Sequence, residues 1–201
     1  MSGGVIRRSV IPGMILFMIL AVSLCTGFKR KKDRDEILRS FIGGTGRYNA
    51  FLWKDIDHDG KEELLLGHGV SHPDGIAIVG FTESGEAVEN PMIGSFGRIT
   101  VCDKNVVAKY GNHGAYYSFI FRLKDGKLER CPVVLFENAS REQVSYHMDF
   151  VDPSLGNTYG ELFDYWLSDN SIMLSEAEYR ALQKTILGEE DWEEICYDNM
   201  E

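Results

Sequence analysis

The chain has 201 residues, of which 44% are hydrophobic, so it is long enough and apolar enough to fold around a core. Its net charge of −10 is unevenly distributed, because positions 35–201 hold 14 basic and 30 acidic residues, a net charge of −16. Such a surface repels phosphates and tolerates divalent cations. Nucleic acid is therefore excluded as an expected partner.

Residues 1–34 have the pattern of a signal peptide or membrane anchor with a basic flank. Arg7 and Arg8 precede the apolar stretch Ser9–Phe28, which is about long enough to span a bilayer, and a basic cluster at 29–32 follows it. Three outcomes stay open: cleavage, retention as an anchor, or cleavage before Cys25 with lipidation of that cysteine. We expect the rest of the chain in the cell envelope or outside the cell, with the membrane as a partner of this segment alone.

Residues 35–188 are expected to form one domain of the α+β class that is mainly β. A short helix over Asp33–Phe41 comes first. Short apolar runs separated by turn residues then predict an antiparallel meander of about seven strands. The Asp125-Gly126 pair favours a tight hairpin. The predicted strands are 48–53, 63–69, 75–82, 97–102, 106–110, 115–123 and 127–136.

Two helical patterns follow the strands. Thr158–Ser168 has apolar residues at helix-like spacing, and a clearer helix begins at Ser175, where Glu178 completes a capping box, and ends at Gly188. The remaining residues, 189–201, are predicted to be an acidic tail that is frayed apart from Trp192, Ile195 and Tyr197. Three cysteines follow residue 34, and we expect two of them, Cys102 and Cys131, to be small core residues, with one disulfide as the alternative.

The strongest chemical pattern is an acidic stretch that begins at Asp55. Asp55, Asp57 and Asp59 alternate, and Gly60 follows them. Alternating aspartates can direct three carboxylates to one point, and Ca²⁺ takes six to eight oxygen ligands. Glycine permits the sharp bend that such a loop needs. The main-chain carbonyl of Lys61 is a further candidate ligand.

The spacing of the acids excludes an EF-hand. An EF-hand loop needs a bidentate glutamate at position 12, which is Leu66 here, whereas the acid falls at position 9, Glu63. A carboxylate at that position closes the loop while the chain leaves it as a strand.

This pattern, D-x-D-x-D-G-x-x-E between two strands, resembles the calcium loops of FG-GAP and VCBS-type repeats. Those repeats occur in the β-propellers of integrin α-subunits and in many bacterial surface proteins. The chain looks most similar to uncharacterised exported bacterial proteins that carry one such loop, a β-meander and a late helix that opens like Ser175–Tyr179. The resemblance implies a Ca²⁺ site formed by Asp55, Asp57, Asp59, Glu63 and the Lys61 carbonyl. One loop and about seven strands are too few for a full propeller.

Two functions are compatible with these patterns. The first is an exported or membrane-anchored calcium-binding domain without catalytic activity, in which Ca²⁺ stabilises the fold. The alternative is a carbohydrate-binding or hydrolase module with a cleft lined by aromatic residues and histidines. That alternative predicts a pocket joining His68 and His113, near the aromatic residues Tyr116, Tyr117 and Trp166.

Overall fold

The computed structural model describes residues 33–42, 46–71, 74–103, 105–112, 114–140, 143–188 and 192–201. The predicted signal or anchor segment lies outside these residues, except for its last two positions. The chain divides into two compact units, Met1–Glu36 and Ile37–Glu201. The second unit contains both sheets and the acidic loop.

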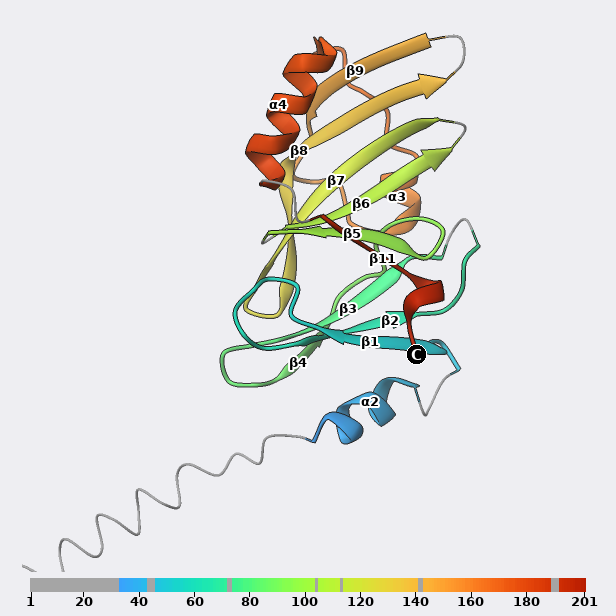
Figure 1. The fold of residues 1–201 in the computed structure, drawn as a ribbon, viewed down its shortest axis with the longest axis vertical. Helices are drawn as coiled ribbons and strands as arrows, with labels where there is room; N and C mark the ends of the chain where they lie inside the picture. The colour runs from blue at the N-terminus through green and yellow to red at the C-terminus, as the bar shows by residue number, and fades with distance from the viewer. Residues whose placement is uncertain are drawn as a thin grey trace, which may run out of the picture. The chain divides into compact units, whose positions relative to one another are not determined.

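The described residues contain eleven strands in two antiparallel sheets, which confirms the mainly β class (Figure 1). The strands number more than the seven expected, and they divide between two sheets. The four-stranded sheet has the order β1-β2-β3-β4, and its strands are Ala50–Lys54, Glu63–Gly67, Ile76–Phe81 and Ala87–Glu89. The seven-stranded sheet has the order β10-β9-β8-β7-β6-β5-β11. From β5 to β11 its strands are Arg98–Cys102, Asn105–Asn112, Ala115–Lys124, Lys127–Ser140, Gln143–Phe150, Ile172–Leu174 and Glu193–Cys196.

The hairpin between β7 and β8 follows the sequence prediction. Lys124 pairs with Lys127, and the two residues between them have positive φ angles, 47° at Asp125 and 77° at Gly126. Two positive φ angles define the type I′ turn, whose twist matches that of the flanking strands. The Asp-Gly pair therefore sets the register of this hairpin.

Strand β8 tolerates a proline because its pairing with β7 is interrupted there. The register shifts between Phe119, which pairs with Val134, and Phe121, which pairs with Arg130. Pro132 lies in the extra length of β8 that this shift leaves. Proline lacks an N–H group and is confined to edges and bulges of sheets. The irregularity lets one long strand continue from Lys127 to Ser140.

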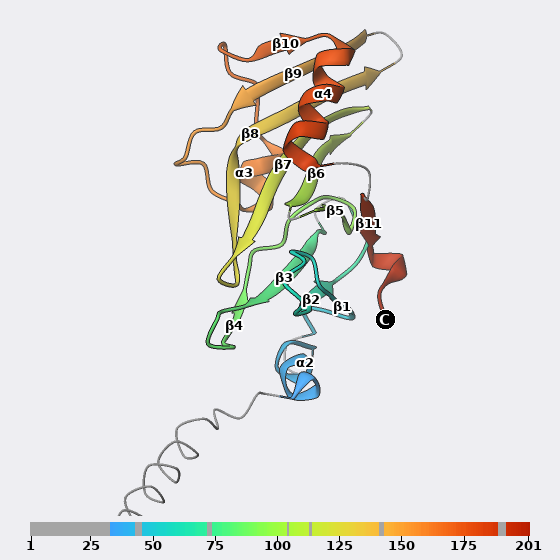
Figure 2. The same cartoon turned by 60° about the vertical axis from the view of Figure 1, so that its left-hand side comes forward.

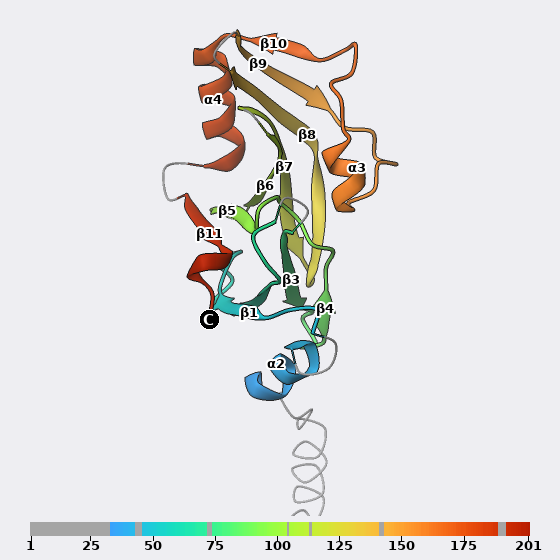
Figure 3. The same ribbon diagram turned by 90° about the vertical axis from the view of Figure 1, so that its right-hand side faces the viewer.

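Two helices lie on opposite faces of the seven-stranded sheet (Figure 3). Helix α3, Tyr159–Phe163, buries Leu162 in the cluster that contains Phe119. Helix α4, Glu176–Leu187, packs Tyr179 against the other face. The predicted capping box of Ser175 and Glu178 is present at the start of α4, and Gly188 ends the helix.

The four-stranded sheet is buried on both of its faces. One face places Leu65 and Ile78 in the same cluster as residues of the seven-stranded sheet. The other face places Leu64 against Ile37 of helix α2, Arg34–Ile42. Strands buried on both faces are apolar throughout, which accounts for the unbroken run of leucines in β2.

Asn90 links the two sheets through buried hydrogen bonds. Its side-chain N–H₂ group donates to the carbonyls of Ile78 in β3 and of Gly126 in the β7–β8 turn, both at 2.9 Å. Its side-chain oxygen accepts from the backbone N–H of Leu128 at 2.8 Å. The backbones are close here, because a Cβ atom on Gly80 would lie 2.5 Å from the Gly126 carbonyl oxygen.

The C-terminal tail is ordered into a strand, contrary to the expectation of an irregular segment. Strand β11 pairs with β5, and Ile195 is 2% exposed in the core. After a short 3₁₀ helix, Tyr197–Asn199, the last residue pairs with β1, since Glu201 and Phe51 exchange backbone hydrogen bonds of 2.9 and 3.0 Å. The tail therefore joins an edge of each sheet, with the C-terminus beside β1 (Figure 2).

Candidate metal centre

The acidic loop connects the first two strands of the four-stranded sheet. Lys54, the last residue of β1, pairs with Glu63, the first residue of β2, so positions 55–62 close one antiparallel hairpin. Within the loop Gly60 has a φ of 86° and His58 a φ of 57°. Glycine reaches that conformation without the clash that a side chain brings, which is the role expected of Gly60.

Aspartate side chains organise the backbone of the loop. The carboxylate of Asp55 accepts hydrogen bonds from the N–H groups of Asp59, at 3.1 Å, and Gly60, at 2.9 Å. The carboxylate of Asp57 accepts from the same Asp59 N–H at 3.2 Å. Aspartate favours turns because its short side chain can bond to the backbone a few residues further along. These bonds bring the Asp55 and Asp57 carboxylates to the inside of the loop.

Glu63 is a buried carboxylate, with a residue exposure of 3%. Its Oε2 atom accepts a 3.0 Å hydrogen bond from the backbone N–H of Ile56, whose own side chain is 1% exposed in the core. The start of the loop is thus fastened to the start of β2. Sequence reasoning did not identify this bond, and the only available indication was an apolar residue between two aspartates.

Three carboxylates converge at this place. Asp55, Asp57 and Glu63 each offer an oxygen, and the three atoms lie within 4.8 Å of one another. The first two residues are half-buried and the third is buried. The structure therefore brings together three of the four carboxylates that the sequence predicts as ligands.

The electrostatics of the loop oppose three negative charges in one place. The pKa of Glu63 is raised to about 7, by burial first and then by the charges of Asp57, Asp59 and Asp55, against the lowering effect of the Ile56 N–H bond. The pKa of Asp57 is also raised, by burial first and by Asp59 next. Like charges at close range disfavour each other's ionised forms. A bound cation would remove this opposition.

Asp59 has a different environment from the other carboxylates. Its Oδ1 atom accepts from the Lys61 N–H at 2.8 Å, and its Oδ2 atom is 3.0 Å from the Lys61 ammonium. Burial would raise the pKa of Asp59, but the bonds from Lys61 outweigh it and the pKa is lowered. The main chain of Lys61 is predicted to contribute a carbonyl ligand, and its side-chain ammonium group is hydrogen-bonded to Asp59.

The structure describes only part of the cleft that the alternative function predicts. His113 lies outside the described residues, so the pocket between His68 and His113 stays a prediction. His68 is exposed, with its Nδ1 atom 3.7 Å from an oxygen of Asp74. Tyr117 packs its ring against Tyr165 on the α3 face, whereas Tyr116 is its neighbour in β7 and points to the other face.

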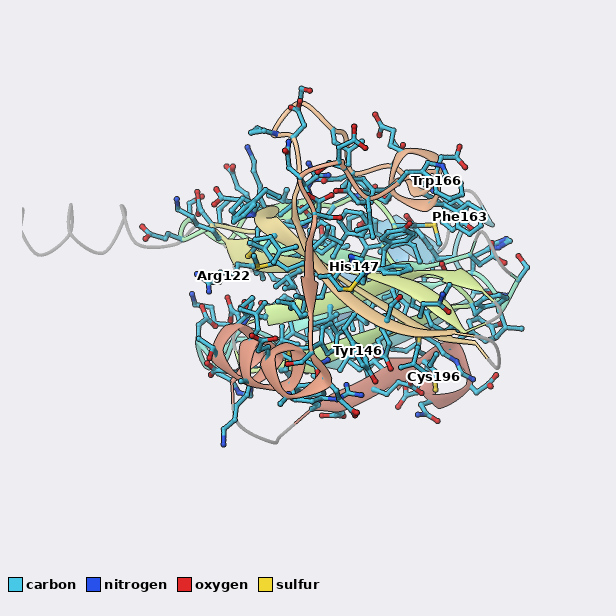
Figure 4. All side chains as sticks on the ribbon, turned by 90° about the horizontal axis from the view of Figure 1, so that it is seen from above. Arg122, Tyr146, His147, Phe163, Trp166 and Cys196 are labelled. Atoms are coloured by element: carbon cyan, nitrogen blue, oxygen red, sulfur yellow. The ribbon has the colours of Figure 1, made fainter. Side chains whose placement is uncertain are left out.

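Figure 4 shows the two faces of the seven-stranded sheet from above. Trp166 lies with Phe163 and His147 on one side, and Tyr146 and Cys196 lie on the other. Trp166 is 81% exposed and lies on the face of the sheet opposite to Tyr116. All three cysteines among the described residues are free thiols, and Cys102 is buried in the core as predicted.

Comparisons of the chain with protein-family models, with curated proteins and with solved structures give no match. None of the helices that the structure describes combines the length and apolar character needed to cross a membrane.

Proposed function

We propose that the loop from Asp55 to Glu63 binds one Ca²⁺ ion and that the ion stabilises the fold. The convergence of the Asp55, Asp57 and Glu63 carboxylates within 4.8 Å carries this proposal. The sequence pattern adds two further ligands, the Asp59 carboxylate and the Lys61 carbonyl. The proposed function is that of a calcium-binding domain without catalytic activity.

The donor set suits a hard cation. All the ligands are oxygens, which Ca²⁺ and Mg²⁺ prefer over the nitrogen and sulfur ligands typical of zinc. Ca²⁺ ligands lie at about 2.3–2.6 Å from the ion, so two of them on opposite sides can be about 5 Å apart. The observed limit of 4.8 Å is compatible with that span. Ca²⁺ also accepts irregular coordination more readily than Mg²⁺ does.

A structural role follows from the position of the loop. All the proposed ligands belong to one hairpin, and Glu63 is tied to Ile56, which belongs to the core. Lys54, next to the first ligand, forms an ion pair with Glu193 of β11. An ion that binds only the folded hairpin stabilises the folded state by mass action. Its loss is expected to weaken the β1–β2 connection first.

We place this domain outside the cytoplasm, anchored at the membrane or released. The support is the apolar stretch Ser9–Phe28 between two basic clusters in the sequence. Protease treatment of intact cells that carry a C-terminally tagged chain tests the location. Degradation of the tag is expected, and a tag that survives until the cells are lysed contradicts an extracytoplasmic domain.

Isothermal titration calorimetry with Ca²⁺ tests the binding itself. The full chain, stripped with chelator, is expected to bind one Ca²⁺ ion, with Mg²⁺ as a weaker competitor. Asp57→Asn keeps the size of the side chain and removes a ligand charge, so it should reduce the affinity strongly. Asp169→Asn, in an exposed turn before β10, is the matched control and should bind like the wild type. Equal binding by both variants would contradict the assigned site.

A further inference from the structure

A groove of about 510 Å³ lies on the α4 face of the seven-stranded sheet. Its floor includes Thr100 of β5, Val107 of β6 and Lys109 of β6. Val107 belongs to the hydrophobic cluster that packs under α4, so the groove lies on the α4 face of the sheet. Small-molecule sites typically have volumes of about 300–1,000 Å³. The groove is separate from the acidic loop and shares no residue with it.

Exposed apolar side chains gather at this groove. Val70 is 52% exposed, Phe96 is 39% exposed and Tyr116 is 37% exposed, and all three line it together with Tyr197. Single exposed apolar residues are ordinary, but several at one concave site indicate a surface that contacts something. Two of the three carry aromatic rings, which offer flat faces to a ligand.

The backbone at Phe96 is held in an unfavourable conformation. Phe96 has a φ of 56° and the next residue, Gly97, a φ of 60°, in a tight turn closed by the bridge between Ser95 and Arg98. A positive φ is unusual for a bulky residue and is found disproportionately at binding sites. The turn presents the Phe96 ring at the groove instead of the small or polar residue that such turns favour.

The charged groups of the groove leave one cation unmatched by a close acid. Arg98 lies 3.5 Å from Glu194 and forms an ion pair with it. Within the described part of the chain, the side chains of Lys109 and Asp198 form no hydrogen bond or ion pair, although both residues line the groove. An available ammonium group is notable on a domain with a net charge of −16 over positions 35–201.

We propose that this groove binds an acidic sugar, namely a pyranose ring that carries one carboxylate. Lys109 would bind the carboxylate through a charge-assisted hydrogen bond. Carboxylate oxygens of Asp198 and Glu194 would accept hydrogen bonds from the sugar hydroxyls, and the C–H face of the ring would lie against Tyr116 or Phe96. A single negative charge fits better than a phosphate dianion, because Glu194 and Asp198 repel additional charge.

Titration calorimetry of the full chain with sodium glucuronate tests this inference, with glucose and benzoate as comparison ligands. Saturable binding of glucuronate that is at least tenfold tighter than that of glucose is expected, because only glucuronate can pair with Lys109. Lys109→Gln should abolish this preference. Lys127→Gln, at an exposed position at the start of β8, should leave it unchanged.

Three outcomes would overturn the inference: no saturable binding of glucuronate up to its solubility limit, equal binding of glucose and glucuronate, or binding of benzoate alone. The side chain of Lys109 is exposed and has no hydrogen-bond or ion-pair partner among the described residues, so Lys109→Gln should melt at the wild-type temperature. If that variant unfolds instead, Tyr116→Leu replaces it in the same titration. The ligand titrations report on the groove whether or not the acidic loop binds Ca²⁺.

Discussion

The backbone N–H of Ile56 donates a 3.0 Å hydrogen bond to Oε2 of Glu63, so the two ends of the acidic loop are joined by a buried carboxylate. Glu63 therefore has two roles, one as a hydrogen-bond acceptor for the loop and one as a negative charge beside Asp55 and Asp57. These roles can be separated by substitution.

Glu63→Gln keeps an oxygen that can accept from Ile56 and removes the charge. In chelator at neutral pH we expect this variant to be more stable than the wild type by about 1 kcal/mol, because it has no charge that burial and the neighbouring aspartates disfavour. It should also lose most of the stabilisation by Ca²⁺. Urea denaturation with and without Ca²⁺ measures both effects. Glu63→Ala also lacks the acceptor for the Ile56 N–H and should be less stable than the wild type. If Glu63→Gln behaved like Glu63→Ala, the acceptor role and the charge of Glu63 would not be separable.

Lys61→Gln tests whether Lys61 competes with the cation for Asp59. The Lys61 ammonium is 3.0 Å from Oδ2 of Asp59, and the substitution releases that carboxylate while leaving the Lys61 main-chain carbonyl in place. We expect Ca²⁺ affinity to rise a few-fold, because a ligand is freed and a positive charge is removed from the site. Calcium titration measures the change. An affinity that stays the same or falls would contradict competition between Lys61 and the cation for Asp59.

Asp149 is predicted to stabilise the segment that follows β9. It is 1% exposed and accepts hydrogen bonds from the Tyr165 hydroxyl, at 2.7 Å, and from the N–H and hydroxyl of Ser168, at 2.6 and 2.7 Å. Asp149→Asn replaces one acceptor oxygen by a donor and should reduce the free energy of unfolding at neutral pH by about 2 kcal/mol. Tyr165→Phe removes a single hydrogen bond and should lower the free energy of unfolding by less. Equal losses in the two variants would contradict the role of Asp149 as the acceptor of several hydrogen bonds.

The same carboxylate gives a pH dependence of known sign. Burial would raise the pKa of Asp149, but the hydrogen bonds from Ser168 and Tyr165 outweigh it and the pKa is lowered. A group with a lowered folded-state pKa stabilises the fold above its unfolded-state pKa, near 4, and loses that effect as the pH falls through the folded-state value. The stability difference between wild type and Asp149→Asn should therefore shrink below about pH 4. A stability difference that stays constant as the pH falls below about 4 would contradict the lowered pKa of Asp149.

Asn90 should be among the side chains most sensitive to substitution, because its amide bonds to both sheets. Asn90→Ala leaves the carbonyls of Ile78 and Gly126 with fewer donors and the N–H of Leu128 without its acceptor, and should cost about 3 kcal/mol in a denaturant titration. Asn90→Asp should be at least as harmful, since it turns a charged oxygen toward two carbonyls. Asn170→Ala, exposed in a turn, is the control.

The strands near the loop could be predicted because their sequence patterns are local. The leucines of β2, the Asp125-Gly126 turn and the Ser175 capping box each specify their own structure within a few residues. The mainly β class follows from such runs. Their division into two sheets depends on which strands pair at a distance, and contacts such as that of Asn90 with Gly126 leave no pattern in the sequence.

Strand β9 shows a missed signal. Val144, Tyr146, Met148 and Phe150 occupy every second position with polar residues between them, which is the alternation expected of a half-buried strand. Strand β11 had no such signal, because its acidic residues favour a solvated tail. It is a strand because Ile195 reaches the core and the backbone pairs with β5.

The acidic loop was identifiable because its candidate ligands lie within nine consecutive residues. The sequence does not reveal that Asp59 bonds to Lys61 while the other three carboxylates converge, since this depends on how the loop closes. The groove near Lys109 could not be predicted at all. Its residues come from separate strands and loops, and Tyr116 and Lys109 become neighbours only through the pairing of β6 with β7.

Thermal unfolding of the full chain in Ca²⁺ and in chelator tests the central claim most directly. Ca²⁺ at about 100 times its dissociation constant should stabilise the fold by roughly 2.7 kcal/mol, which raises the melting temperature by about 5–10 °C for a domain of this size. Asp57→Asn should show no such rise, and Asp169→Asn should show all of it. An unchanged melting temperature of the wild type in Ca²⁺, or an equal rise in Asp57→Asn, would contradict a structural calcium site in this loop.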